Sequence, residues 1–305
     1  MWTRARFNKA YVPGMFAWMI DSYEQKRAES MYNQLVTMKT SRKKKEENAG
    51  RSGLALPTLK GEGAPVTYDT QIAGATQTWI HDVYAIAVRI TEESIEDNLY
   101  ELDAGGGYKE LSYDIGEALA ENLETLCARF FNYGTATTYH TTRDGKALFA
   151  TDHPRLDGST FSNKGTDADL TYLTFWSNLI TAENQYNHRQ YRIKKKVEKL
   201  WVAPQYERKA IEILKSSDRP DTGNRAISAY ARSGRKIREM VWPYMTDTDQ
   251  FIYQMSGQGI IMFNRRKTRF ARDKDFETGD MLIKGDQRFS IEINDPQCFY
   301  GVVPA

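Results

Sequence analysis

The clearest hydrophobic pattern along the chain lies between residues 108 and 133. Its apolar residues recur at three- and four-residue steps, the spacing that gathers side chains on one face of an α-helix. They are Leu111, Ile115, Leu119, Leu123, Leu126 and Phe130. Gly134 follows directly and suits a helix end. The pattern predicts one long amphipathic helix over residues 108 to 133, with its leucines in a core.

A second helical pattern covers residues 13 to 40 and mixes apolar with charged positions. Pro13 suits the first turn of a helix. The residues that share one face are Phe16, Ile20, Tyr23, Arg27, Met31 and Leu35. A face that combines Met and Tyr with charge is typical of a helix that docks on a partner. Residues 41 to 53 follow as a charged linker.

Residues 54 to 90 alternate between polar and apolar positions and are rich in Thr, Tyr and Val, which predicts a pair of strands. Gly61, Gly63, Pro65 and Gly74 interrupt the pattern. A two-stranded hairpin of this kind buries little apolar surface alone. We therefore expect it to lie on another surface, which favours a role in assembly over one in catalysis.

The remaining chain mixes helices and strands. Residues 170 to 186 have the pattern of a second amphipathic helix, and residues 199 to 203 that of a buried strand. Residues 204 to 215 form a third predicted helix, opened by a proline. Short strands are expected from 227 to 270, and closing strands after residue 275.

Composition and charge narrow the function classes. The chain has 305 residues, 40% of them hydrophobic and 27% charged, which suits a globular protein. Its net charge of +2 argues against a surface devoted to nucleic acid. Residues 1 to 53 hold 11 basic and five acidic residues, so a basic arm precedes a slightly acidic body. No apolar run reaches the length of a membrane span, so no membrane partner is expected.

Few residues offer catalytic chemistry. Asp152 and His153 are adjacent, and with Cys127 or Cys298 they would supply the residue types of a nucleophilic set. Cys127 falls on the apolar side of the long predicted helix, where a thiol is buried and inert. We expect both cysteines to be buried thiols without a disulfide.

Motifs for metals and cofactors are missing from the sequence. The four histidines share no metal-ligand spacing. The glycine clusters at 61 to 63 and 105 to 107 lack the frame of a phosphate-binding loop, so no cofactor is expected. Two basic runs, at 42 to 45 and 194 to 196, are interpreted as solvated segments, with proximity to phosphate as the sharper alternative.

The order of these elements resembles the major capsid proteins of tailed bacteriophages, which have the HK97-like fold. The segments that carry the resemblance are LPTLKGEGAPVTYDTQIAG with VYAIAVRIT, DGKALFATDHP, KLWVAPQYERKAIEIL and DFETGDMLIKGDQRFSIEINDPQCFYG. The second of these, at 144 to 154, is similar to a turn that follows the spine helix in head subunits of the Mu-like type. Together the segments span nearly the whole chain in the family's order.

The resemblance implies an α+β fold in consecutive parts. These are an N-terminal arm (1–50), an extended E-loop hairpin (51–90), a peripheral domain (91–164) with a spine helix (108–133), an axial domain (165–268) and closing strands of the peripheral domain (269–305). The family carries no enzymatic activity in its shell role, so the protein is expected not to be an enzyme.

The family role is structural. The resemblance implies hexamers and pentamers of this chain that close into an icosahedral head around double-stranded DNA, contacted without sequence specificity. It implies a virion capsid assembled in the cytoplasm of a bacterial host, with scaffolding, portal and decoration proteins as separate partners. Some members crosslink an E-loop lysine to an asparagine. Lys60 matches the lysine, but Asp275 stands near the partner position, so no crosslink is expected.

The residues expected at interfaces between copies come from the arm, the basic linker and the hairpin. They are Phe16, Ile20, Tyr23, Arg27, Lys43, Lys44, Lys60, Glu62, Tyr68 and Trp79. Deletion of residues 1 to 50 is expected to leave a folded body that makes no regular shells.

Three other functions stay open. An encapsulin-like compartment shell shares the fold and encloses protein cargo. A hydrolase with a site near Asp152 and His153 would lose activity in His153→Ala, whereas a shell subunit would change only in assembly or stability. A DNA-binding regulator is disfavoured because no predicted helix has the basic and amide-rich face of a recognition helix.

Overall fold

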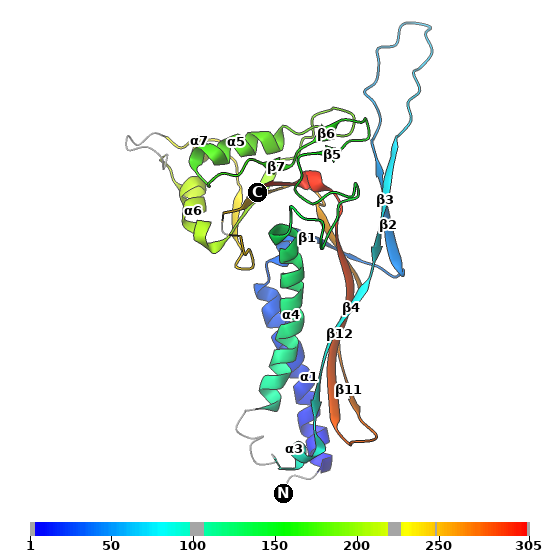
Figure 1. Ribbon diagram of the computed structural model, residues 1–305, viewed down its shortest axis with the longest axis vertical. Helices are drawn as coiled ribbons and strands as arrows, with labels where there is room; N and C mark the ends of the chain where they lie inside the picture. The colour runs from blue at the N-terminus through cyan, green and yellow to red at the C-terminus, as the bar shows by residue number, and fades with distance from the viewer. Residues whose placement is uncertain (1–3, 98–106, 219–226, 248, 304–305) are drawn as a thin grey trace. The chain divides into compact units, whose positions relative to one another are not determined.

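The chain divides into two compact units, each assembled from separate stretches of sequence. The computed structural model describes residues 4–97, 107–218, 227–247 and 249–303 (Figure 1). The first unit comprises 1–45, 80–127 and 262–291, and the second comprises 46–79, 128–261 and 292–305. The domain boundaries expected from the sequence remain predictions, and most of the glycine break at 105 to 107 lies outside the described residues.

The first unit is built on a four-stranded sheet. Its strands lie in the order β1 (Val36–Thr40), β11 (Ile260–Lys274), β12 (Met281–Ile293) and β4 (Asp82–Ile90). Strands β12 and β4 are antiparallel, with Met281 opposite Ile90 and Phe289 opposite Asp82. These neighbours are separated by about 190 residues of chain. Non-local pairing therefore organises this unit.

Two long helices complete the core of the first unit: α1 (Arg4–Glu29) and α4 (Tyr108–Asn132). The long helix predicted over residues 108 to 133 is thus confirmed. Ile115 and Leu119 of α4 pack with Met15 and Met19 of α1 and with Ile283 of β12. The same apolar spacing that predicted the helix therefore faces the sheet and the first helix. Two short helices, α2 (Tyr32–Leu35) and α3 (Glu92–Asp97), belong to the same unit.

The helices α1 and α4 approach closely at Gly116. A Cβ atom at that position would lie 2.5 Å from the backbone oxygen of Met19, so glycine is required there. Farther along α4, the buried Glu124 carboxylate accepts hydrogen bonds from the backbone N–H groups of Met31 and Tyr32, at the start of α2. The N-terminal helix is therefore an integral part of the first unit.

Two expectations for the N-terminal region are wrong. The helix predicted over residues 13 to 40 ends at Glu29, and the extended residues Val36–Thr40 form β1 instead. The charged linker predicted over 41 to 53 contains strand β2 (Lys45–Arg51). A strand of such charged composition depends on a distant partner strand, which the local pattern does not reveal.

The second unit is built on a five-stranded sheet. Its strands lie in the order β7 (Lys164–Gly165), β13 (Phe299–Val302), β10 (Phe251–Met255), β8 (Val197–Val202) and β9 (Arg238–Val241). Strand β10 is antiparallel to β13 and β8, whereas β8 and β9 are parallel. The buried strand predicted over 199 to 203 is confirmed in β8.

Alternate residues of β8 point to different faces of this sheet. Leu200 and Val202 join a core formed with the helices α5 (Tyr172–Glu183), α6 (Glu207–Lys215) and α7 (Ala229–Arg232). Trp201 instead packs against Phe131 of the last turn of α4, with 5.7 Å between ring centroids. The second and third predicted helices are thus confirmed as α5 and α6, the latter preceded by the 3₁₀ turn Pro204–Tyr206.

The hairpin of the second unit differs from its prediction. Strand β2 pairs with β3 (Ala73–Ile80), and residues 52 to 72 between them form no helix or strand. Strand β4, predicted as the other half of the hairpin, belongs to the sheet of the first unit. Gly61, Gly63 and Pro65 therefore mark a long loop between the strands, whereas Gly74 lies within β3. A second small pair joins β5 (His153–Pro154) to β6 (Thr160–Phe161), and a 3₁₀ turn covers Pro296–Cys298.

His140 gives the second unit a dependence on pH. Its ring stacks on Phe130 at 3.8 Å between centroids, and its Nε2 atom is buried without a hydrogen-bond partner in the described part of the chain. Burial, followed by the nearby charge of Arg129, lowers the pKa of His140 to about 4. In the unfolded chain the pKa is about 6.5. As the pH falls through this interval, the unfolded state binds the proton first and becomes favoured.

We therefore expect the melting temperature to fall between about pH 6.5 and pH 4, and to fall less steeply in His140→Phe. Calorimetry of both proteins across this range measures the melting temperature at each pH. The carboxylates titrate alike in both proteins, so their contribution cancels when the two pH slopes are subtracted. Identical pH slopes for the two proteins would contradict the assignment.

Candidate assembly surface

The loop between β2 and β3 exposes an unusual amount of apolar surface. Leu59 and Tyr68 are 101% and 94% exposed. Other exposed apolar residues of the loop are Leu54, Leu56, Val66 and Ile72. Figure 1 shows the loop projecting beyond the ends of the two strands. Soluble proteins seldom leave such a cluster uncovered, so the loop has the character of a contact surface for another molecule.

The base of this loop is held in place by polar contacts within the second unit. The backbone N–H of Ser52 donates to the carbonyl of Ile72 at 3.1 Å, and the N–H of Ile72 donates to the Ser52 hydroxyl at 3.0 Å. Arg189 donates to the Thr70 carbonyl at 2.7 Å and to the Ser52 hydroxyl at 3.2 Å. These hydrogen bonds fix the direction in which the loop leaves the ends of β2 and β3.

Asp69 adds a further anchor near the base. Its carboxylate accepts from the backbone N–H of Ala55 at 2.7 Å and lies 3.4 Å from a guanidinium nitrogen of Arg189. The hydrogen bond from Ala55, together with the Arg189 charge, holds the pKa of Asp69 below its usual value. Arg189 was not predictable from the sequence, because its role depends on a contact across more than a hundred residues.

The predicted interface residues of the hairpin separate into two groups. Lys60, Glu62 and Tyr68 are exposed on the loop, where a partner can reach them. Trp79 is only 2% exposed and is packed within the chain. Its place at an interface between copies stays a prediction, because burial within one chain does not test contacts between chains.

Part of the α1 face that was predicted to contact a partner packs against the core of the first unit. Phe16 and Tyr23 are half-buried and pack against the core of Met15 and Met19. Ile20 and Arg27 remain exposed, as do Lys43 and Lys44 in the segment before β2. These exposed residues stay predicted contact positions.

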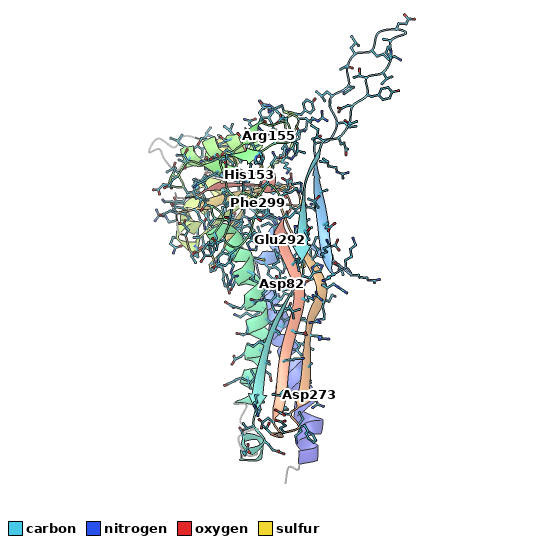
Figure 2. All side chains as sticks on the ribbon, turned by 45° about the vertical axis from the view of Figure 1, so that its right-hand side comes forward. Asp82, His153, Arg155, Asp273, Glu292 and Phe299 are labelled. Atoms are coloured by element: carbon cyan, nitrogen blue, oxygen red, sulfur yellow. The ribbon has the colours of Figure 1, made fainter. Side chains whose placement is uncertain are left out.

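The geometry around His153 is that of a structural residue. The side chain is completely buried, and its Nδ1 atom lies 2.7 Å from Asp144 Oδ2 while Nε2 lies 3.3 Å from the Leu148 carbonyl. The ring also stacks on Phe161. In Figure 2, His153 and Phe299 lie in the densely packed body of the second unit. Both ring nitrogens are occupied, so neither is available to a substrate.

Asp152 does not assist this histidine. Its exposed carboxylate pairs with Lys146 at 2.6 Å, whereas the His153 ring is held by Asp144. Burial opposes ionisation of Asp144, but hydrogen bonds from His153 and Thr142 keep the pKa of Asp144 below its usual value. The predicted hydrolase set is therefore not assembled.

The two cysteines are free and buried, as predicted. Burial raises the pKa of the Cys127 thiol well above its usual value, with the Glu124 charge as a second cause. Burial likewise raises the pKa of Cys298 to about 12, with Asp295 as a second cause. Thiols of this kind are poor nucleophiles.

The described residues were also compared with the requirements of a metal site and of a membrane span. Among the described residues, no three His, Cys, Asp or Glu side chains gather as a metal centre would require. None of the described helices combines the length and hydrophobicity that a membrane span needs.

The basic run at 194 to 196 is not uniformly solvated, because Lys195 turns inward and pairs with Asp295 at 2.5 Å.

Comparison with known proteins gives a result for structure and none for sequence. No family model matches the chain, and no curated protein sequence matches it. The capsid structure of Cyanophage P-SCSP1u matches with a TM-score of 0.58 and 14% identity, over 90% of this chain and 88% of that one. The capsid of an empty GTA particle matches with a TM-score of 0.55 and 11% identity, over 90% of each chain.

A third structure extends the same fold beyond phage particles. The virus-like particle from Pyrococcus furiosus matches with a TM-score of 0.53 and 12% identity, over 96% of this chain and 99% of that one. The chain therefore has the α+β, HK97-like fold of phage capsid proteins, as its resemblance to that family implied. Identities this low establish the fold and leave the function to be argued from the molecule.

Proposed function

We propose that this protein is the major subunit of an icosahedral bacteriophage head. Copies of the chain form hexamers and pentamers that close around double-stranded DNA in the cytoplasm of a bacterial host. The role is structural and not enzymatic, and scaffolding, portal and decoration proteins are separate partners. The observation that carries the proposal is the loop of residues 52 to 72, which displays apolar side chains on a capsid fold without covering them.

The uncovered loop favours association with another copy of the chain. Burial of each large apolar side chain contributes about 1.5–3 kcal/mol, so a loop with six of them gains strongly from a partner. A loop that docks on a different surface of the next copy makes a head-to-tail contact. Contacts of this type generate rings when the rotation between copies closes. Anchoring of the loop base by Arg189 lowers the entropy lost on docking.

Electron microscopy and sedimentation of the purified protein test this proposal. We expect closed particles or rings of six chains. A ring of six 35.1 kDa chains has a mass of about 211 kDa. A monomer or dimer at every protein concentration and salt condition tested would overturn it.

A compartment shell is the second candidate. It is favoured by the match to the virus-like particle from Pyrococcus furiosus, which spans nearly the whole of both chains. Particles isolated from the native host separate the two functions: nuclease-protected DNA inside them supports the phage head, and enclosed protein without DNA supports the compartment.

A further inference from the structure

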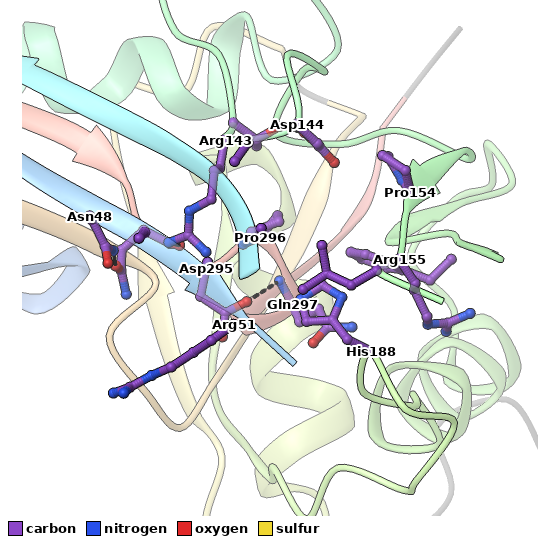
Figure 3. Close-up of a pocket in the computed structure, with 18 residues that line it drawn as sticks. Asn48, Arg51, Arg143, Asp144, Pro154, Arg155, His188, Asp295, Pro296 and Gln297 are labelled. Atoms are coloured by element: carbon purple, nitrogen blue, oxygen red, sulfur yellow. Dashed lines mark hydrogen bonds between the residues drawn. The ribbon is translucent and has the colours of Figure 1, made fainter. Parts of the chain in front are cut away.

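A cavity of about 490 Å³ lies within the second unit, at the base of the β2–β3 hairpin. One side is formed by Gly50 of β2 and Gly74 of β3. The rest is formed by three loops that carry Arg143, Arg155 and His188, and by the 3₁₀ turn Pro296–Cys298 with the residues before it. Figure 3 shows that these side chains come from different segments of the chain and surround one space. The volume is typical of a small-molecule site.

The cavity has an excess of hydrogen-bond donors. The Nε atoms of Arg143 and Arg155 and the Nδ1 atom of His188 are buried, and none has a partner in the described part of the chain. Arginine nitrogens can only donate, and a neutral histidine can donate from Nδ1. The three side chains that carry these atoms line the cavity, where hydrogen-bond donors therefore outnumber the carboxylates that can accept from them.

The two carboxylates that line the cavity, Asp144 and Asp295, already have hydrogen-bond partners. The Asp144 carboxylate accepts from Thr142 and lies 2.7 Å from His153 Nδ1. The Asp295 carboxylate pairs with Lys195 at 2.5 Å and accepts from the backbone N–H of Gln297 at 3.0 Å. Neither carboxylate makes a hydrogen bond or ion pair to either arginine among the described residues.

The charge on Arg143 is poorly compensated. Among the described residues, the guanidinium makes one weak hydrogen bond, from Nη2 to the Asn294 carbonyl at 3.3 Å. Burial lowers the pKa of Arg143, although the Asp295 and Asp144 charges oppose the shift. The backbone of Gly50 approaches so closely that a Cβ there would lie 2.8 Å from Arg143 Nη1. The Arg143 side chain thus lies against β2, and its Nε atom has no hydrogen-bond partner among the described residues.

We propose that this cavity binds an oxyanion, either a phosphate or a carboxylate, through Arg143, Arg155 and His188. Such a group offers several acceptor oxygens on one negative centre, which matches both the surplus donors and the surplus positive charge. The proposal stands on the cavity alone and is independent of the proposed shell function.

Occupancy of this site has a mechanical consequence. Because β2 and β3 form one wall and the loops form the other, a bound anion connects the hairpin to the body of the second unit. The anion therefore restrains the strands from which the exposed apolar loop extends.

Titration calorimetry of the full-length protein with sodium phosphate, and separately with sodium succinate, tests the proposal. The buffer is Tris hydrochloride, which supplies no oxyanion, with sodium chloride at constant ionic strength. We expect saturable binding of one anion per chain, and the more tightly bound of the two identifies the ligand class. Arg143→Gln is expected to weaken binding by about ten-fold or more, because it removes a charged donor. Arg208→Gln removes the same charge from an exposed position on α6 and is expected to leave binding unchanged.

Hydrogen exchange of the wild-type protein provides a measurement that needs no variant. Phosphate or succinate at saturation is expected to slow exchange in residues 46–52 and 73–79, and to leave α6 unaffected. The proposal is overturned if neither anion binds, if Arg143→Gln binds as well as wild type, or if Arg208→Gln weakens binding equally. If Arg143→Gln does not fold, unchanged hairpin exchange in the wild type overturns it.

Discussion

Leu119→Asp protein is expected to be recovered as insoluble or unfolded material. Leu119 is buried on α4, in the core of the first unit that also contains Met19 of α1 and Ile283 of β12. A carboxylate placed there loses its hydration and gains no partner, which costs several kcal/mol in addition to the lost apolar burial. The whole stability of a domain is only about 5–15 kcal/mol. Circular dichroism and size-exclusion chromatography of the soluble fraction measure the outcome.

Ala118→Asp is the matched control for this experiment. Ala118 precedes Leu119 on the same helix but is exposed, so the same carboxylate there remains hydrated. Only the helix propensity changes, by about 0.7 kcal/mol. Soluble, helical Leu119→Asp protein with a melting temperature close to that of the control would show that α4 is not a core helix.

Replacement of residues 54 to 71 by a two-residue Asn-Gly turn is expected to abolish particles and to preserve the fold. Strands β2 and β3 end on either side of this segment, and an Asn-Gly turn suits the connection of two antiparallel strands. The removed residues are exposed and contribute no core. We expect a melting temperature within a few degrees of wild type, and sedimentation only of monomers or small oligomers.

A milder variant tests the chemistry of the loop without changing its length. Leu59→Ser with Tyr68→Ser removes the two most exposed apolar side chains of the loop and is expected to weaken assembly at least ten-fold in critical concentration. Gln71→Ser, at an exposed polar position of the same loop, serves as the control. Normal particles from the shortened chain would eliminate the loop as an assembly contact.

The helices with regular apolar spacing were predictable from the sequence. The stripe that includes Leu119 and Leu123 specified α4 because every fourth or third residue faces the same core. The run at 199 to 203 specified β8 because consecutive apolar residues, here Leu200 to Val202, are typical of a strand covered on both faces. Both signals are local, and both elements bury the residues expected.

The elements that depend on distant partners were not predictable. Strand β2 has the sequence KEENAGR, which favours a linker, and it becomes a strand through β3. The expectation that residues 1 to 50 can be deleted without loss of folding is likewise not supported. That deletion would remove Met15 and Met19 from a core and β1 from a sheet.

The candidate site also has one part with a local sequence signal and one part that depends on distant residues. The exposed loop was recognisable, since its glycines and Pro65 interrupt a segment rich in Thr, Tyr and Val. Arg189, Arg143 and His188 carry no local signal, because each is a single polar residue in a loop. Only the folded chain brings them to the base of the hairpin.

The pairing of β4 with β12 constrains when the protein can fold during its synthesis. A ribosome that has produced β4 must add about 190 further residues before the partner strand exists. At about 5–20 residues per second, β4 waits on the order of ten to forty seconds without a neighbour on that edge. The first unit thus closes only when nearly the entire chain has emerged, and its apolar helix faces stay open until then. Slow translation would prolong this vulnerable interval, and release of the finished chain ends it.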